Sequence, residues 1–408
     1  MLGSFRNNDG CAIARSNEAK ALGIKMGAPW FQIRHLAESD GLVALSANFA
    51  LYGDMSDRMM SVAAGMGPTQ EVYSIDETFI GLDGVRGDLS ARGRKVRERI
   101  LQWTGIPTCV GIGPTKTLAK LANHVAKSAE RKPGSYPAEL AQVCDLSRLT
   151  PEQRTEVFKA TAVEEVWGIG RRISKQLKDA QIETVQDFIE LDTATVRAGW
   201  SVVLERTHRE LRGTSCIEIE DAPQNKQEIA CTRSFGRAVT ELDDLSEAVS
   251  TFASRAAEKL RKQDSYAGQV LTFIRTSPFR PDPQYSRSVI VPLRRPTADT
   301  AHIASAALTG LRAIYRVGFK YAKAGVMLLD LQDATVHQHE LDLEADECVK
   351  DKSRLMSAMD QLNRRYGRGT LLLGSSGLDA NERIWSMKQE RLTPQYTTKW
   401  SDLVIARA

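Results

Sequence analysis

Residues 71–82, Glu-Val-Tyr-Ser-Ile-Asp-Glu-Thr-Phe-Ile-Gly-Leu, constrain the fold of this chain more than any other segment. Two runs rich in apolar and β-branched residues flank the adjacent acids Asp76 and Glu77, which predicts a β-hairpin with both carboxylates at its tip. Acids are common in turns, so a solvated hairpin end is the simpler interpretation of the pair alone. The alternative is a divalent-cation site, because one or two carboxylates commonly hold Mg²⁺ together with substrate phosphates.

Three further segments favour the cation site. They are residues 7–11 (Asn-Asn-Asp-Gly-Cys), 166–172 (Val-Trp-Gly-Ile-Gly-Arg-Arg) and 396–403 (Tyr-Thr-Thr-Lys-Trp-Ser-Asp-Leu). With the Ser-Ile-Asp-Glu of the hairpin, they resemble the Y-family translesion DNA polymerases, in the branch of UmuC (the catalytic subunit of bacterial DNA polymerase V) and its plasmid-borne relatives. The resemblance implies an α+β, multidomain, right-hand architecture with palm, fingers, helix-hairpin-helix thumb, ferredoxin-like little finger and a C-terminal tail.

This resemblance also implies a function: error-prone translesion DNA synthesis in the SOS response, by Mg²⁺-dependent nucleotidyl transfer onto a primer terminus. Asp76 and Glu77 would be the catalytic metal ligands for two Mg²⁺ ions, while Asn17, Lys20 and Lys127 would contact the incoming triphosphate. The implied partners are primed damaged DNA, deoxynucleoside triphosphates, a UmuD′-like dimer and RecA filaments.

One part of the family pattern is missing. Family members carry a third carboxylate on a first palm strand, a few dozen residues before the Asn-Asn-Asp-Gly turn, but here only residues 1–6 precede that turn and none is acidic. Asp9 is the sole early acid, and its place in a turn makes it a poor ligand. We therefore expect the first palm strand to be absent, through either a late gene start or a true truncation, and the 408 residues to be weakly active or inactive.

Two other functions remain as alternatives. The first is a truncated, catalytically impaired DNA-binding protein of the same family, which would occupy primer termini or sequester UmuD-like partners. The second is another palm-type nucleotidyl transferase such as a cyclase, and the predicted thumb and little finger disfavour it because a cyclase has no duplex to hold.

Composition limits the cellular setting. A chain of 408 residues exceeds what one hydrophobic core usually organises, so two to four domains are expected. Six scattered cysteines without Cys-x-x-Cys spacing argue against a zinc site or a disulfide framework. Neither a transmembrane run nor an export signal is present, so no membrane contact and a cytoplasmic location are expected.

Charge is distributed unevenly along the chain. Residues 90–134 hold ten Lys or Arg against two Glu, whereas residues 340–351 are strongly acidic. On the helix predicted for residues 115–130, Lys116, Lys120 and Lys127 share one side, opposite an apolar stripe. The simplest interpretation of the lysine side of this helix is a solvated face. No acid lies among these three lysines, and they are next to a proposed metal site. Both features favour phosphate contact, most strongly for Lys127.

The predicted domains are palm with fingers in residues 1–145 (fingers about 11–66), thumb in 146–221, little finger in 222–335, and an acidic linker with the tail in 336–408. In the thumb, Gly168, Gly170, Arg171 and Arg172 precede a helix, a pattern that suits backbone contact with a DNA phosphate.

The little finger is predicted as β-α-β-β-α-β, the split ferredoxin-like order. Arg233 and Arg237 on its first strand would bind DNA, although basic residues on edge strands can instead serve to block aggregation. Residues 338–344 occupy the place of a sliding-clamp peptide, Gln-Leu-x-Leu-Phe, but glutamates replace its glutamine and its phenylalanine. Clamp binding is therefore doubtful.

Overall fold

The computed structural model describes residues 2–5, 10–222, 224–335, 352–377, 383–387 and 389–405. The chain divides into two compact units. One unit holds residues 1–48 and 224–393, and the other holds residues 49–223 and 394–408. Asp9 and the clamp-like peptide at 338–344 lie outside the described residues.

The second unit begins with a helix in the range predicted as fingers, followed by the elements of the predicted palm. These are α4 (Phe49–Ala64), β4 (Thr69–Val72), β5 (Thr78–Gly81), α5 (Leu89–Thr104), β6 (Val110–Ile112), α6 (Lys116–Arg131) and β7 (Val143–Asp145). Strands β4 and β5 are antiparallel, which confirms the hairpin, and β6 runs parallel to β7. The methionine-rich helix α4 packs Met59 and Met60 against Ile100 of α5, so these two methionines are core residues.

The thumb follows in the same unit. Its helices are α7 (Pro151–Lys159), α8 (Arg171–Asp179), α9 (Val185–Glu190), α10 (Thr193–Gly199) and α11 (Val202–Leu211). A turn with Gln181 in the left-handed region (φ 62°) joins α8 to α9, as the helix-hairpin-helix prediction requires. Palm and thumb share one core, in which Val125 of α6 packs with Phe158, Phe188 and Leu204.

Glu210 of α11 fastens the thumb to the palm. Its fully buried carboxylate accepts a hydrogen bond from the Thr117 amide at the start of α6 (3.0 Å). It also accepts hydrogen bonds from the Cys216 amide (2.6 Å) and the Ile217 amide (3.0 Å) in the segment that leaves the thumb. The carboxylate thereby satisfies one of the amides at the N-terminus of α6, which lack partners within the helix.

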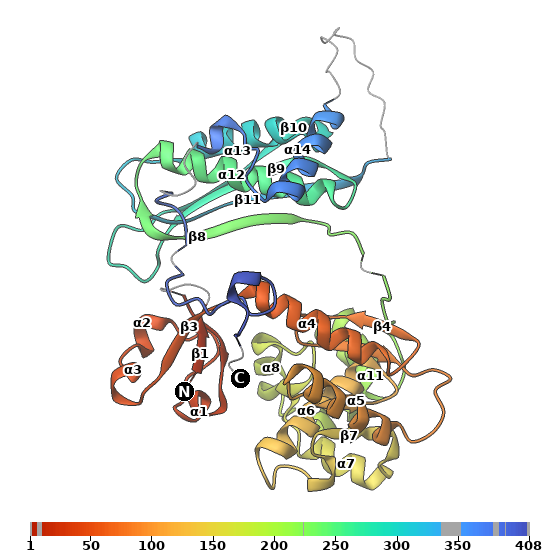
Figure 1. Cartoon of the computed structure of the whole chain (residues 1–408). Helices are drawn as coiled ribbons and strands as arrows, with labels where there is room; N and C mark the ends of the chain where they lie inside the picture. The colour runs from red at the N-terminus through yellow and green to blue at the C-terminus, as the bar shows by residue number, and fades with distance from the viewer. Residues whose placement is uncertain are drawn as a thin grey trace. The chain divides into compact units, whose positions relative to one another are not determined.

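In the first unit, residues 224–335 form the predicted β-α-β-β-α-β domain. Its elements are β8 (Ile229–Val239), α12 (Leu242–Arg261), β9 (Ser265–Thr276), β10 (Ser286–Thr297), α13 (Thr300–Ile314) and β11 (Tyr321–Asp333). The sheet order is β10-β9-β11-β8 with antiparallel neighbours, so each βαβ unit is split by one strand. Both helices cover the same face of the sheet (Figure 1).

The same unit contains a small N-terminal sheet. Strand β1 (Leu2–Phe5) lies between β2 (Ala12–Arg15), to which it is antiparallel, and β3 (Val43–Ser46), to which it is parallel. The short helices are α1 (Asn17–Ala21), α2 (Trp30–Ile33) and α3 (Leu36–Ser39). Ser16 caps α1 by accepting a hydrogen bond from the Ala19 amide.

The C-terminal tail contributes α14 (Ser353–Tyr366) and two short 3₁₀ turns, Gly374–Ser376 and Trp400–Asp402. Helix α14 buries Met356, whereas Leu355 and Leu362 are exposed. Within the described ranges, no helix is long and apolar enough to cross a membrane.

Candidate active site and DNA-contacting residues

A groove of about 340 Å³ lies between β5, residues 106–112 and helix α6. Asp76, Glu77, Lys120 and Lys127 all line it, and apolar side chains of α4 and α5 complete its wall. The structure therefore brings together three of the predicted site residues, namely both acids and Lys127.

The hairpin turn presents the two acids side by side. The amides of Tyr73 and Ser74 both donate to the Glu77 carbonyl (3.1 Å each), which closes the turn. The Ser74 hydroxyl donates to Oδ1 of Asp76 (2.7 Å), which orients that exposed carboxylate. This local closure explains why residues 73–77 hold both carboxylates at the tip, as the sequence predicted.

Lys120 neutralises Glu77. Its Nζ lies 2.8 Å from both carboxylate oxygens, with side chains 20% exposed for Lys120 and 37% exposed for Glu77. The same ammonium lies 5.1 Å from the Tyr73 ring centroid and 6.0 Å from that of Trp167, within cation–π range. A cation held by Glu77 would therefore have to displace Lys120 from at least one carboxylate oxygen.

An aromatic cluster connects the thumb to this hairpin. The Trp167 indole donates to the Tyr73 hydroxyl (3.1 Å), and its ring centroid lies 5.8 Å from that of Phe79. Sequence reasoning quoted Trp167 only as part of a motif and assigned it no contact. Trp167 lies about ninety residues after Tyr73, so no local sequence pattern predicts their contact.

The phosphate-facing interpretation of Lys116 is wrong. Its side chain is 7% exposed, is paired with Glu71 of β4, and donates to the Glu218 carbonyl (2.8 Å). On a helix wheel Lys116 lies on the same solvent-facing side as Lys120 and Lys127. In the structure, β4 and the segment after the thumb cover that part of α6. Lys116 is therefore a buried ion-pair partner in this structure.

The donor set at the groove suits a hard cation. Within the part of the chain that the structure describes, no group of three or more His, Cys, Asp or Glu side chains gathers as a metal cluster. Asp76 and Glu77 supply two adjacent carboxylates, the number of protein ligands that Mg²⁺ usually takes when phosphates and waters complete its shell. The residues present therefore fit Mg²⁺ bound together with a nucleotide.

Asn17 and Lys20 lie on α1, in the unit that does not contain the acidic hairpin. The Lys20 ammonium donates to Oδ1 of Asn17 (3.4 Å), so the two predicted phosphate ligands do form one local pair. Their relation to Asp76 remains a prediction.

The N-terminus of α8 has the features predicted for phosphate contact. Gly168 adopts φ +92°, where a side chain would be strained, and Gly170 is the N-cap without a side-chain acceptor for the first helical amides. Arg171 and Arg172 are both exposed on the first turn. This end of the helix can bind an anion through its backbone and its charges together.

On the little-finger sheet, Arg233 and Arg237 differ. Arg233 is paired with Ala324 and shares the helix-covered face with buried Cys231. It lies near Arg255 of α12, whose pKa is lowered by burial and, less strongly, by Arg233. Arg237 is exposed, so it is the better candidate of the two for contact with DNA.

Comparisons with known proteins match most of the chain. Residues 2–124 match the impB/mucB/samB family, residues 226–341 its C-terminal domain, and residues 353–406 a domain of unknown function. The chain is 45% identical over 402 residues to the protein UmuC, and 42% identical over 407 residues to the protein ImpB, both of Salmonella typhimurium. Each match covers 98% of this chain and 92% of the relative.

The fold is also similar to a solved structure, a Y-family DNA polymerase chimera of Dbh and Dpo4, with a TM-score of 0.61. The similarity covers 81% of this chain and 91% of the chimera at 17% sequence identity.

Proposed function

Because the chain belongs to the impB/mucB/samB family, the UmuC branch of the Y-family DNA polymerases, we propose that the groove at Asp76 and Glu77 is its polymerase active site. The protein is an error-prone translesion DNA polymerase that acts in SOS mutagenesis. Its substrates are primed damaged DNA and deoxynucleoside triphosphates. The observation that carries the site assignment is the groove that unites the two acids with Lys127.

Two Mg²⁺ ions are the proposed cofactor, held by Asp76 and Glu77 together with the triphosphate. When bound, such ions stabilise both the attacking and the leaving oxygen of an in-line displacement. Ser74 orients Asp76 for this role, whereas Lys120 holds Glu77 in place and must release at least one of its oxygens. Lys127, exposed on the same groove, would neutralise the leaving phosphates.

Duplex DNA is proposed to be held without reading its sequence. The N-terminus of α8, with Arg171 and Arg172, would bind a backbone phosphate, and Arg237 would bind another on the little-finger side. Asn17 and Lys20 are proposed to contact the triphosphate from the fingers. A UmuD′-like dimer and RecA filaments are the proposed protein partners, and the cytoplasm is the proposed location.

Primer extension tests this proposal directly. The chain would be assayed with Mg²⁺ and all four deoxynucleotides on undamaged and abasic templates, with and without a UmuD′-like dimer and RecA filaments. Asp76→Ala should lower extension by at least about a hundredfold, because a misplaced reacting group alone costs that much. Asp57→Ala, which removes an exposed carboxylate on α4, should leave extension unchanged. Extension that survives Asp76→Ala would overturn the site.

One observation favours a second candidate, a catalytically impaired DNA-binding protein of the same family. Glu130 also lines the groove and pairs with Arg97, but within the described ranges no third acid joins Asp76 and Glu77 in a metal-ligating cluster. This function predicts tight binding to primed DNA and no extension under any of the conditions above. Binding that is equal in the parent chain and in Asp76→Ala, with extension in neither, would favour it over the polymerase.

A further inference from the structure

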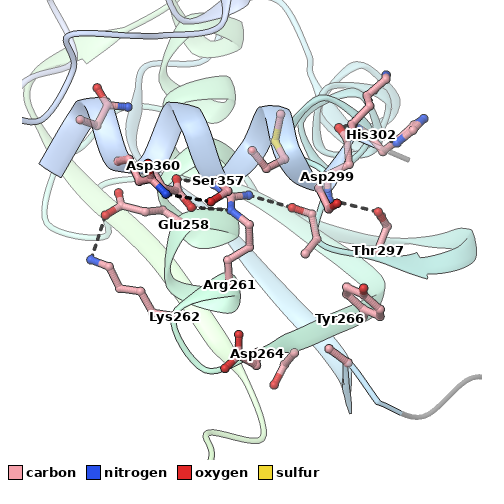
Figure 2. Close-up of a pocket in the computed structure, with 18 of the residues that line it drawn as sticks. Glu258, Arg261, Lys262, Asp264, Tyr266, Thr297, Asp299, His302, Ser357 and Asp360 are labelled. Carbon is pink, nitrogen blue, oxygen red and sulfur yellow. Dashed lines mark hydrogen bonds and ion pairs between the residues drawn. The ribbon is translucent and has the colours of Figure 1, made fainter. Parts of the chain in front are cut away.

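The segment matched as a domain of unknown function is held against the little finger along its first half. Arg261 of α12 forms a two-pronged ion pair with Asp360 of α14, at 2.7 and 2.8 Å. Figure 2 shows this contact between α12 and α14 beside a cavity of about 880 Å³. Farther along, the Ser250 hydroxyl of α12 bonds those of Ser375 (2.6 Å) and Ser376 (3.2 Å).

Trp385 is the deepest anchor of this segment. Its side chain is 5% exposed within the little-finger core, and its ring lies 5.5 Å edge-on from the ring of Phe252. Arg383 stacks over the same indole (5.2 Å) and pairs with Glu247 (3.3 Å). The Gly236 amide of β8 donates to the Ser386 carbonyl (2.9 Å). The chain is therefore fixed to the little finger as far as residue 386.

A few residues later the same segment is fixed to the N-terminal sheet. The Ser46 amide at the end of β3 donates to the Arg391 carbonyl (2.9 Å), and Leu392 forms a parallel bridge with Ser46. The Asn48 amide group donates to the Thr393 carbonyl (3.0 Å), and the Arg391 guanidinium lies 5.1 Å from the Trp30 ring. The tail thus extends the edge of β3, a mode of binding in which backbone hydrogen bonds supply the affinity.

The short chain between these two attachments limits how far apart they can lie. Trp385 and Arg391 are six positions apart, and an extended chain spans at most 3.3–3.6 Å per residue, so they lie no more than about 22 Å apart. We infer that the described parts of residues 352–393 form an intramolecular strap, anchored by Trp385, that restricts how far the N-terminal sheet can separate from the little finger.

This strap has a consequence that rests on the proposed function. The N-terminal sheet carries the proposed triphosphate ligands, and the little finger carries a proposed DNA contact. Limiting their separation keeps both contacts near one primer terminus through a high effective concentration. Loss of the strap shortens the time that the polymerase stays on DNA and leaves a single insertion step unchanged.

Hydrogen exchange on the full chain tests the strap without DNA. Trp385→Ala should speed exchange of the Gly236 and Ser46 amides by more than tenfold each. A second variant, with twelve Gly/Ser residues inserted between residues 387 and 388, leaves the anchor intact. It lengthens the link from six to eighteen residues, which lowers the effective concentration by about fivefold under a −3/2 power law. Ser46 exchange should rise by that factor, while Gly236 stays protected.

Trp400→Ala is the matched control, since it removes an exposed tail tryptophan (90% exposed) that lies outside the strap. It should leave both amides unchanged. Ser46 protection that survives both Trp385→Ala and the insertion would overturn the strap.

Primer extension separates this inference from the proposed function. With excess trap DNA, both strap variants should give shorter products per binding event than the parent chain, and Trp400→Ala should match the parent. If no protein extends primers but the exchange pattern is as expected, the polymerase assignment fails and the strap stands.

Discussion

Replacing Lys120 by glutamine should tighten metal binding at the acidic hairpin. The lysine ammonium lies 2.8 Å from both oxygens of Glu77, so an ion that uses this carboxylate must displace it. Glutamine retains a similar length and a hydrogen-bond donor but lacks the charge. The variant therefore removes the competition while leaving a partner that can still orient Glu77.

The size of the effect follows from the exposure of the pair. Both partners are partly exposed, at 20% and 37%, so solvent screens the attraction. Measured pairs of this kind contribute about 0.2–1 kcal/mol, which at 1.4 kcal/mol per factor of ten equals about 1.4- to 5-fold in affinity. We expect Lys120→Gln to bind the metal more tightly by a factor in this range.

Terbium luminescence provides an assay that needs no catalytic activity. Tb³⁺ prefers oxygen ligands, and the Trp167 and Tyr73 rings close to Lys120 are sensitisers for an ion bound at Glu77. Titration with Tb³⁺, followed by displacement with Mg²⁺, gives both affinities. Lys127→Gln is the matched control, because it makes the same substitution in the same groove without removing a partner of Glu77. Weaker metal binding by Lys120→Gln than by the parent would refute the reasoning.

Three other predictions concern the thumb. Glu210→Ala leaves the buried Thr117 amide and the half-buried Cys216 and Ile217 amides without this acceptor, and should lower the free energy of unfolding by about 3–5 kcal/mol in urea titrations. Exposed Glu156→Ala should change it by less than about 0.5 kcal/mol. Arg171→Ala and Arg172→Ala should each reduce the slope of log affinity for DNA against log salt by about 1, and an unchanged slope would exclude phosphate contact. Burial lowers the pKa of His208, so the unfolded chain binds its proton more readily. The contribution of neutral His208 to folding stability should therefore be fully present above about pH 6.5 and fall as the pH drops below it. His208→Gln should lessen this fall, as measured by thermal unfolding at pH 5–7.

The sequence predicted the elements whose evidence is local. Alternating β-branched residues around a short turn specify the hairpin, and its own backbone hydrogen bonds place Asp76 and Glu77 at the tip. The β-α-β-β-α-β order was predicted correctly, because each strand and helix carries its own periodicity. The family resemblance, rather than these patterns, supplied the polymerase function.

Contacts between distant segments could not be predicted from such local patterns. A helix wheel shows which side of α6 is polar, but it does not show that β4 covers Lys116 at one end of that side. Arg233 was assigned to DNA from its place on a strand. Its register against β11 turns it toward α12, and its contact with DNA stays a prediction. In both cases the surroundings of the charge depend on a neighbouring element.

The acidic hairpin also depends on the segment that leaves the thumb. A two-stranded hairpin alone is marginally stable in water, so β4 and β5 need support from elsewhere. The Glu220 amide donates to the Glu71 carboxylate (2.7 Å), and Asp221 accepts from the Gln70 amide (3.0 Å). Glu71 in turn pairs with Lys116, one turn of α6 before Lys120. Because one network joins the thumb exit, β4 and α6, the position of Glu77 is set by residues almost 150 positions away in the sequence.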